Sequence, residues 1–221
     1  MRRMHTALAL ALVPVAAFSM SGCRGSAEAE PQGGTNPKVQ IMVGGIDKVI
    51  YLPAKLTEQL GYFKDEGVDV TMLSEPSGAS AENVLVAGQV QGVVGFYDHT
   101  ITLQAQGKCI ESVVQLAKVP GEAEVVSNAA AATLTSPKNF AGRKLGVTSP
   151  GSSTDYLTQY LAAKHGLKTK DYTTVKADAG PTFSAALTNG GTDPGMPPAP
   201  TLATTLPRGA RPAPTVKPPR P

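Results

Sequence analysis

Short apolar runs alternate with amphipathic segments through the body of this chain, and most of the amphipathic segments end at a glycine. Such runs predict buried strands, and the segments between them predict helices with glycine at the C-terminal cap. Strands are expected at 39–43, 68–73, 93–96 and 112–116, and helices at 53–60, 80–87 and 98–106. This alternation indicates an α/β fold with a mainly parallel sheet covered by helices.

The same order begins again in the second half of the chain. Strands are expected at 144–147 and 172–175, and helices at 154–165 and 181–189. Matching landmarks lie 104, 105 and 102 residues apart: Val43 with Val147, Gly61 with Gly166, and Gly88 with Gly190. The repeated order predicts two similar α/β lobes, 38–128 and 129–193, with a ligand cleft between them.

The spacing of apolar residues predicts which face of a helix is buried. Leu52, Leu56 and Leu60 recur every four residues in the first helix, which makes them its expected apolar face. In the helix at 154–165, the residues expected to face the core are Tyr156, Leu157, Tyr160 and Leu161.

The start of the chain has the order of a bacterial export signal that ends in a lipid-bearing cysteine. Two arginines precede an apolar run from Ala7 to Phe18, which is too short to span a bilayer as a helix. The run leads to Met20-Ser21-Gly22-Cys23, which resembles a lipobox. We expect a signal peptide at 1–22, membrane anchoring through Cys23, and a flexible tether at 23–37. The alternative is an ordinary cleaved signal whose cysteine has no role.

The distribution of charge argues against nucleic-acid binding, although the formal net charge is +3. Between residues 38 and 193 there are 13 basic and 15 acidic residues, and no basic stripe with interleaved aromatics. The stretch 194–221 holds 10 prolines and 4 basic residues, which predicts a disordered or polyproline II tail. Two explanations remain open for this tail, a genuine proline-rich segment or a truncated or frameshifted gene.

The strongest candidate for ligand contact is VTSPGSSTDYL at 147–157, where a strand, a turn and a helix follow one another. Gly151, Ser152, Ser153 and Thr154 place hydroxyls and main-chain N–H groups at the positive end of the helix dipole, which suits an anion or a polar oxygen. The alternative is that Ser153 or Thr154 only caps the helix.

Two loops of the first lobe supply further candidates. In GGIDKVIY, Asp47 and Tyr51 are expected to line the cleft, unless Asp47 and Lys48 form a solvated pair. In FYDHT, Tyr97 offers an aromatic face and a hydroxyl, and His99 is either a ligand contact or an exposed loop residue. Asp98 is either a ligand contact or the N-cap of its helix.

Several stretches resemble the nitrate/sulfonate/taurine class of ABC-transporter solute-binding proteins, among which is a thiamine-precursor-like branch. The most specific are LGYFKDEGVDV and LGVTSPGSST, and the resemblance extends from about Lys38 to Leu202. It implies a periplasmic-binding-protein-like fold whose second lobe is incomplete here. It also implies that the loop from Gly151 to Thr154 meets the ligand, and that a membrane permease receives the solute.

The expected function is therefore the extracytoplasmic capture of a small polar or anionic solute for an ABC importer. We expect a monomer in the periplasm or on the outer face of the cytoplasmic membrane, with no cofactor and no metal. Motifs of hydrolases, zinc proteases and phosphate-binding loops are missing from the sequence. Two alternatives stay open, an enzyme like the thiamine-pyrimidine synthase that shares this fold, and a surface lipoprotein outside transport.

Overall fold

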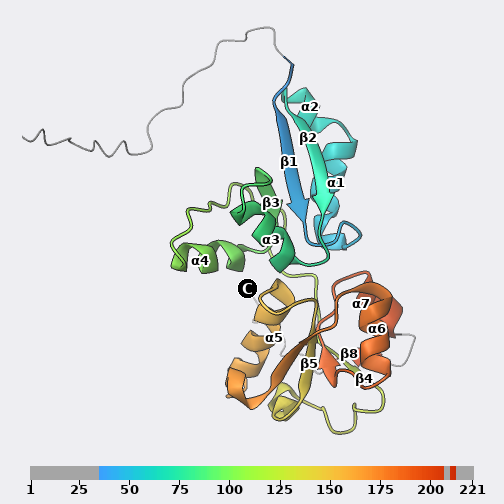
Figure 1. The fold of residues 1–221 in the computed structure, drawn as a ribbon. Helices are drawn as coiled ribbons and strands as arrows, with labels where there is room; N and C mark the ends of the chain where they lie inside the picture. The colour runs from blue at the N-terminus through green and yellow to red at the C-terminus, as the bar shows by residue number, and fades with distance from the viewer. Residues whose placement is uncertain (1–34, 207–209, 213–221) are drawn as a thin grey trace, which may run out of the picture. The chain divides into compact units, whose positions relative to one another are not determined.

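A computed structural model describes residues 35–206 and 210–212 of the chain. The expected signal peptide, Cys23 and nearly all of the tether lie outside these described residues. The described part contains two α/β lobes, each built around its own sheet (Figure 1).

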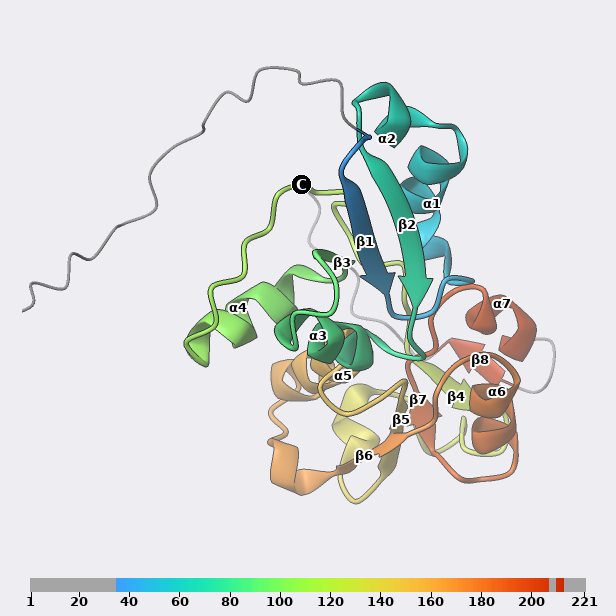
Figure 2. The ribbon, with the colours of Figure 1, turned by 45° about the horizontal axis from the view of Figure 1, so that its top comes forward.

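The sheet of the first lobe has three described strands in the order β2-β1-β3. They are β1 (Lys38–Val43), β2 (Asp69–Ser74) and β3 (Gly92–Val94), and β1 pairs in parallel with both neighbours. The helices are α1 (Leu52–Gln59), α2 (Tyr62–Asp65), α3 (Gly78–Val86) and α4 (Tyr97–Ala105), and a 3-10 turn covers Val49–Tyr51. Figure 2 shows β1 and β2 side by side, with α1 and α2 next to β2. Met42, Ala81 and Val90 form the small buried core of this lobe.

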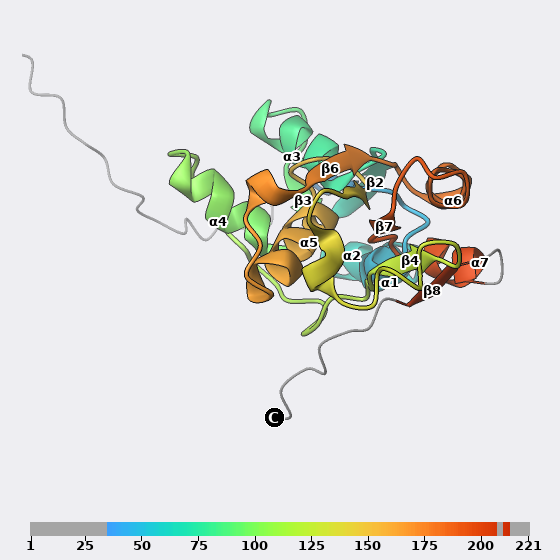
Figure 3. The same ribbon diagram turned by 90° about the horizontal axis from the view of Figure 1, so that it is seen from below.

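The sheet of the second lobe has five described strands in the order β6-β5-β7-β4-β8. They are β4 (Val125–Ser127), β5 (Lys144–Val147), β6 (Thr173–Lys176), β7 (Pro194–Gly195) and β8 (Ala210–Pro212). β5 pairs in parallel with β6 and β7, whereas β4 is antiparallel to β7 and β8. The helices are α5 (Ser153–Lys164), α6 (Gly180–Thr188) and α7 (Thr201–Thr205), with 3-10 turns at Pro137–Phe140 and Thr169–Asp171. Figure 3 shows α6 and α7 near β4 and β8.

Two apolar clusters stabilise the second lobe. Phe140, Leu145 and Ala162 belong to one of them, and Phe183 and Leu187 belong to the other. All five side chains are almost completely buried. The first cluster packs β5 against α5 through Leu145 and Ala162.

The strand order confirms two similar α/β lobes with mainly parallel pairing. Each lobe contains three strands with helices between them, and the first strand of the three lies at the centre in both β2-β1-β3 and β6-β5-β7. Because the carboxyl ends of parallel strands meet at one edge of a sheet, each lobe has one edge at which its loops gather.

The strand expected at 112–116 is wrong, because this segment has no regular structure. β3 pairs with β1 on one side, and no other described strand lies on its second side. The run at 112–116 does not pair with that free edge, so its backbone lacks the cross-strand hydrogen bonds that define a strand. Val113 is consequently 90% exposed.

The expected buried faces of two helices also need correction. Leu52 and Leu56 of α1 and Leu60 at its C-cap are exposed. The helix instead buries Ala54 and uses Glu58, whose Oε1 accepts the N–H of Met72 at 2.8 Å on the β2 strand.

In α5 the fully buried face is mostly polar, with Thr154, Thr158 and Ala162 at spacing four. Tyr160 is exposed, although the spacing of apolar residues predicted that it would face the core. Tyr156, Leu157 and Leu161 are half-buried.

The tail expected to be irregular from 194 onward contains β7, α7 and β8 in its described part, so the expectation is wrong there. Pro194 lacks a donor, but its neighbours supply the main-chain bonds. Asp193 N–H donates to Lys144 O at 2.8 Å, and Met196 N–H donates to Gly146 O at 2.9 Å. The boundary expected after 128 also moves, because β4 already belongs to the second sheet. Residues 207–209 and 213–221 lie outside the described part.

Candidate functional site

The loops that follow β1, β2 and β3 meet the start of α5 at one place. The backbone at Gly44 passes so close to Gly78 that a Cβ on Gly44 would lie 2.3 Å from the Gly78 nitrogen. A Cβ on Gly78 would lie 3.1 Å from Nε2 of His99 and 3.8 Å from Oγ of Ser153. Glycine is therefore required at 44, and the two lobes approach each other at 78.

His99 lies at the centre of this meeting place, in the first turn of α4. Its Nδ1 is 2.8 Å from Oε2 of Glu82 and 4.0 Å from Oδ2 of Asp98. Its ring packs edge-on against Tyr156 of α5, with 6.5 Å between the ring centroids. The Tyr156 hydroxyl in turn accepts a hydrogen bond from Thr102 at 3.4 Å. These contacts join α3, α4 and α5 across the two lobes.

Lys48 and Tyr51 reach the site from the loop after β1. Both side chains are buried, and burial lowers the pKa of Lys48 to about 8 and raises that of Tyr51 to about 12. Glu122, on the segment that connects the lobes, faces Lys48 and Asp98, and burial raises its pKa to about 7 although the ammonium of Lys48 acts in the opposite direction. The site thus holds the ammonium of Lys48 close to the carboxyl group of Glu122.

Glu124 follows two residues later and is only 1% exposed. Its Oε2 accepts a hydrogen bond from Oγ1 of Thr158 on α5 at 3.2 Å. Burial raises the pKa of this carboxyl to about 8, and the bond from Thr158 offsets only part of that rise. Burial also raises the pKa of Asp98 and of Glu82, against the opposing effect of His99.

We call this set of polar side chains the inter-lobe cluster. Its members are contributed by both lobes and by the connecting segment: Lys48, Tyr51, Glu82, Asp98, His99, Glu122, Ser153 and Tyr156. Such a concentration of buried ionisable groups is typical of functional sites.

The structure brings only part of the expected first-lobe residues into the cluster. Tyr51, Asp98 and His99 belong to it. Asp47 is exposed, and its neighbour Lys48 takes the buried position. Tyr97 is 65% exposed and lies outside the cluster. Asp98 does not cap α4, since the N-cap position is Phe96 and Asp98 lies inside the first turn.

The loop from Gly151 to Thr154 is folded mainly upon itself. The hydroxyls of Thr148, Ser152 and Thr154 bond to one another at 2.8 to 3.0 Å. Gly151 N–H donates to the carboxylate of Asp155 at 2.8 Å. Only the hydroxyl of Ser153 is turned toward Gly78 and His99. Most of the donors expected for a ligand are thus already used within the chain.

The sequence reasoning missed the buried acids of the cluster and Lys48. A usable signal was present in GEAEVV, where Glu122 and Glu124 precede an apolar strand and are separated by one residue. Two acids at that spacing point to the same side of an extended chain. The apolar end of that stretch is the start of β4, which carries Glu124 into the core.

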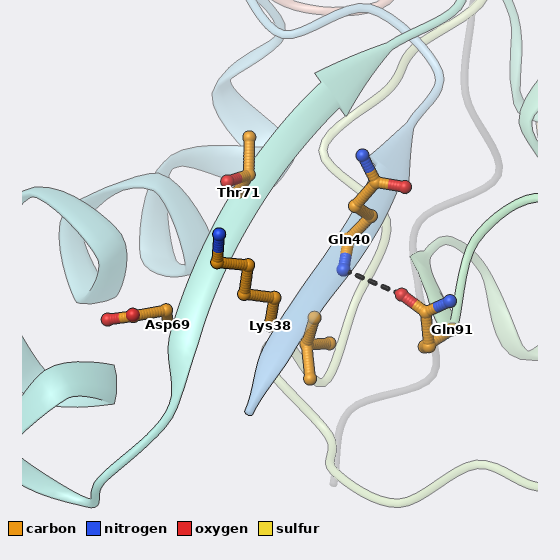
Figure 4. Close-up of a pocket in the computed structure, with 6 residues that line it drawn as sticks. Lys38, Gln40, Asp69, Thr71 and Gln91 are labelled. Carbon is orange, nitrogen blue, oxygen red and sulfur yellow. Dashed lines mark hydrogen bonds between the residues drawn. The ribbon is translucent and has the colours of Figure 1, made fainter. Parts of the chain in front are cut away.

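One hollow lies beside the cluster, and another lies away from it. A cavity of about 840 Å³ is bounded by β3, α4 and the segment 109–121, and Tyr51, Glu82 and His99 border it. A shallower hollow of about 470 Å³ lies at the opposite ends of β1 and β2 (Figure 4). There Gln40 N–H donates to the side-chain oxygen of Gln91 at 2.8 Å. The second hollow is too far along the strands to share the chemistry of the cluster.

The NMT1/THI5 like family matches residues 51–199, which include all of the cluster except Lys48. The chain belongs to this family. A curated relative in Saccharomyces cerevisiae, the 4-amino-5-hydroxymethyl-2-methylpyrimidine phosphate synthase THI11, is 25% identical over 126 residues, which is 57% of this chain and 36% of the relative. The chain thus spans about a third of the length of the curated relatives that it matches.

Solved structures establish the fold. A protein from Bordetella bronchiseptica RB50 is 34% identical with a TM-score of 0.73, over 79% of this chain and 55% of that one. The alkanesulfonate-binding protein SsuA from Xanthomonas axonopodis pv. citri, bound to MOPS, is 24% identical with a TM-score of 0.63, over 83% and 61% of the two chains. The periplasmic nitrate-binding protein NrtA from Synechocystis PCC 6803 is 17% identical with a TM-score of 0.63, over 80% and 50%. The periplasmic-binding-protein-like fold is therefore confirmed.

Two further observations concern the described residues only. None of their helices is long and apolar enough to cross a membrane. Nor do they contain a group of three or more His, Cys, Asp or Glu side chains placed to hold a metal ion.

Proposed function

We propose that this protein is the extracytoplasmic solute-binding component of an ABC importer, which captures a small polar solute between its two lobes and delivers it to a membrane permease. The observation that carries the proposal is the inter-lobe cluster, in which His99 of one lobe and Ser153 of the other both lie next to Gly78. The names of the similar structures, alkanesulfonate-binding and nitrate-binding proteins, support this function class.

The position of the cluster fits capture by closure. Ligands of open α/β sheets bind at the carboxyl ends of the strands and the amino ends of the helices. The cluster lies there in both lobes, and the segment at 121–124 connects them. A solute held by His99 from one lobe and by Ser153 from the other would stabilise the closed arrangement.

The same proposal includes the location and the parts of the chain. Residues 1–22 would direct export, Cys23 would carry the lipid, and 23–37 would act as a tether. The soluble body would then work as a monomer, in the periplasm or on the outer face of the cytoplasmic membrane, next to its permease.

The test is a broad solute panel followed by a matched pair of histidine variants. Thermal shifts and titration calorimetry on the mature chain should reveal at least one saturably bound small solute. His99→Ala should then weaken binding roughly 10-fold or more, since it removes a buried polar contact. His165→Ala is the control, because His165 lies at the other end of α5, where Nδ1 is 2.9 Å from Leu161 O. Equal affinities for the two variants would refute the site.

A second candidate is an enzyme, and the similarity to the pyrimidine phosphate synthase of yeast is the observation in its favour. The two functions differ in what the purified protein should contain and consume. Bound pyridoxal phosphate or metal, with turnover, would favour the enzyme. Reversible binding of an unchanged solute would favour transport.

A further inference from the structure

The segment that follows α4 makes few hydrogen bonds of its own. Residues 111–120 are all exposed, and Val113, Val114 and Val119 are 90%, 66% and 75% exposed. Within the described part of the chain, none of the main-chain N–H groups at 111–119 donates a hydrogen bond. Valine favours strands, because its branched side chain packs well on a pleated surface. The run at 112–116 thus has the composition of a strand without the pairing of one.

The outer edge of β3 lacks a partner as well. β3 pairs with β1, and no described strand lies on its other side. The hollow of about 840 Å³ is lined by both features, by residues 91–95 and by residues 109–121. A free edge presents unpaired main-chain N–H and C=O groups, and the run at 112–116 presents the same groups. Each of the two therefore offers what the other lacks.

The chain connection between β3 and the run suits parallel pairing. Parallel neighbours need a crossover of about a dozen residues or more, usually with a helix. Residues 95–111 form the connection here, and α4 lies within it. A parallel strand must also end at the carboxyl edge of the sheet. The segment does so, because a Cβ on Gly121 would lie 3.6 Å from Cγ2 of Ile50, in the 3-10 turn of the loop after β1.

The segment is held at both ends and is free between them. At its start, the carbonyl oxygen of Ile110 accepts a hydrogen bond from Nε2 of Gln104 on α4 at 3.1 Å. At its end, Gly121 lies against Ile50. Hinges are a few loop or element-terminal residues that absorb a change of backbone angles, and Gly107 before the segment and Gly121 after it have no side chain to hinder such a change. A segment fixed only at its ends can cross the hollow without moving either lobe.

We propose that residues 111–120 form a strap with two arrangements, and that in the second the run at 112–116 pairs in parallel with the free edge of β3. This movement closes the hollow and buries valines that are exposed in the open arrangement. Glu82 and His99 of the inter-lobe cluster border the hollow, so the closed strap shields that side of the cluster from water. The inference goes beyond the proposed function, since it concerns the free chain and needs no solute.

Hydrogen exchange of the mature chain, followed by NMR without any solute, tests the strap. In the open arrangement the amides of 112–116 are unbonded, so they should exchange as fast as those of an unstructured peptide. Pairing with β3 should slow alternate amides of the run at least roughly 10-fold. Exchange at the unstructured rate throughout the run would overturn the inference. Protection that grows with protein concentration would also overturn it, because it would show pairing with a second copy.

A matched pair of double variants shows whether the protection comes from this run. Val113→Lys with Val114→Lys should abolish it, because neighbouring side chains of a strand point to opposite faces and one of the two lysines must enter the covered face. Ala117→Lys with Val119→Lys makes a similar change at exposed residues outside the run, and should leave the protection intact. All four residues are exposed in the open arrangement, so unchanged exchange in β1 shows that both variants fold. Equal protection of 112–116 in the two variants would overturn the inference.

Discussion

Replacing Glu124 with glutamine should remove a large part of the pH dependence of folding. The carboxyl is 1% exposed, and burial raises its pKa from 4.5 to about 8. Glutamine keeps the shape and the acceptor for Thr158 but does not titrate. The difference between the two proteins therefore isolates the proton on Glu124.

The sign follows from where the proton is held. Below about pH 4.5 the carboxyl is protonated in the folded and in the unfolded chain, so it contributes no pH dependence. Between about pH 4.5 and about pH 8 the unfolded chain has released the proton and the folded chain keeps it. The free energy of unfolding should then fall by about 1.4 kcal/mol for each pH unit, or about 3 kcal/mol from pH 5 to pH 7.

Urea unfolding of both proteins at about pH 5 and about pH 7 measures this difference. The pKa of Glu122 is raised in the same direction, but Glu122 is present in both proteins, so its effect cancels. Lys48 acts with the opposite sign only above about pH 8, where the folded chain has begun to lose its proton. Stability that changes with pH by the same amount in both proteins would refute the reasoning.

Three further predictions follow from the site, the anchor and the surface. Ser152→Ala should lower the free energy of unfolding by about 1 to 3 kcal/mol in urea titrations, because it breaks the buried hydroxyl network. Ser153→Ala should instead weaken solute binding with little change in stability, and the reverse pattern for the two variants would contradict the geometry. Cys23→Ser should move the protein from the membrane fraction to the soluble fraction of a bacterial host, and continued membrane association would contradict the lipid anchor. Leu56→Gln on α1 should change stability by less than about 0.5 kcal/mol, whereas Leu145→Ala in the core should cost about 2 to 5 kcal/mol, and similar losses for the two would contradict the observed burial.

The sequence predicted strands and helix ends correctly where local pattern determines the structure. The runs around Val43 and Val147 are strands, and the glycines after the helices adopt the left-handed conformation at 61, 88 and 166. The pattern failed wherever a distant partner decides structure. Val113 and its neighbours have strand propensity but no paired edge, and the leucines of α1 have helical spacing but face solvent.

The position of the candidate site could be predicted from the sequence, but its buried acidic residues could not. Strand ends predicted that the loops at Tyr51, His99 and Ser153 would meet, and they do. Burial of Glu122 and Glu124 depends on how the connecting segment crosses between the lobes, which no local spacing determines. For the same reason, the hydroxyls near the start of α5 looked available in the sequence, whereas the folded chain uses most of them itself.

Hydrogen exchange with and without the best solute of the panel tests the central claim most directly, since that claim is capture between the lobes. The solute should slow exchange in two separate segments, 96–100 in the first lobe and 152–156 in the second, and both effects should saturate at the same solute concentration. His99→Ala should abolish both together. Protection confined to one lobe, or protection at the strand ends around Lys38 and Asp69 instead, would contradict a binding site between the lobes.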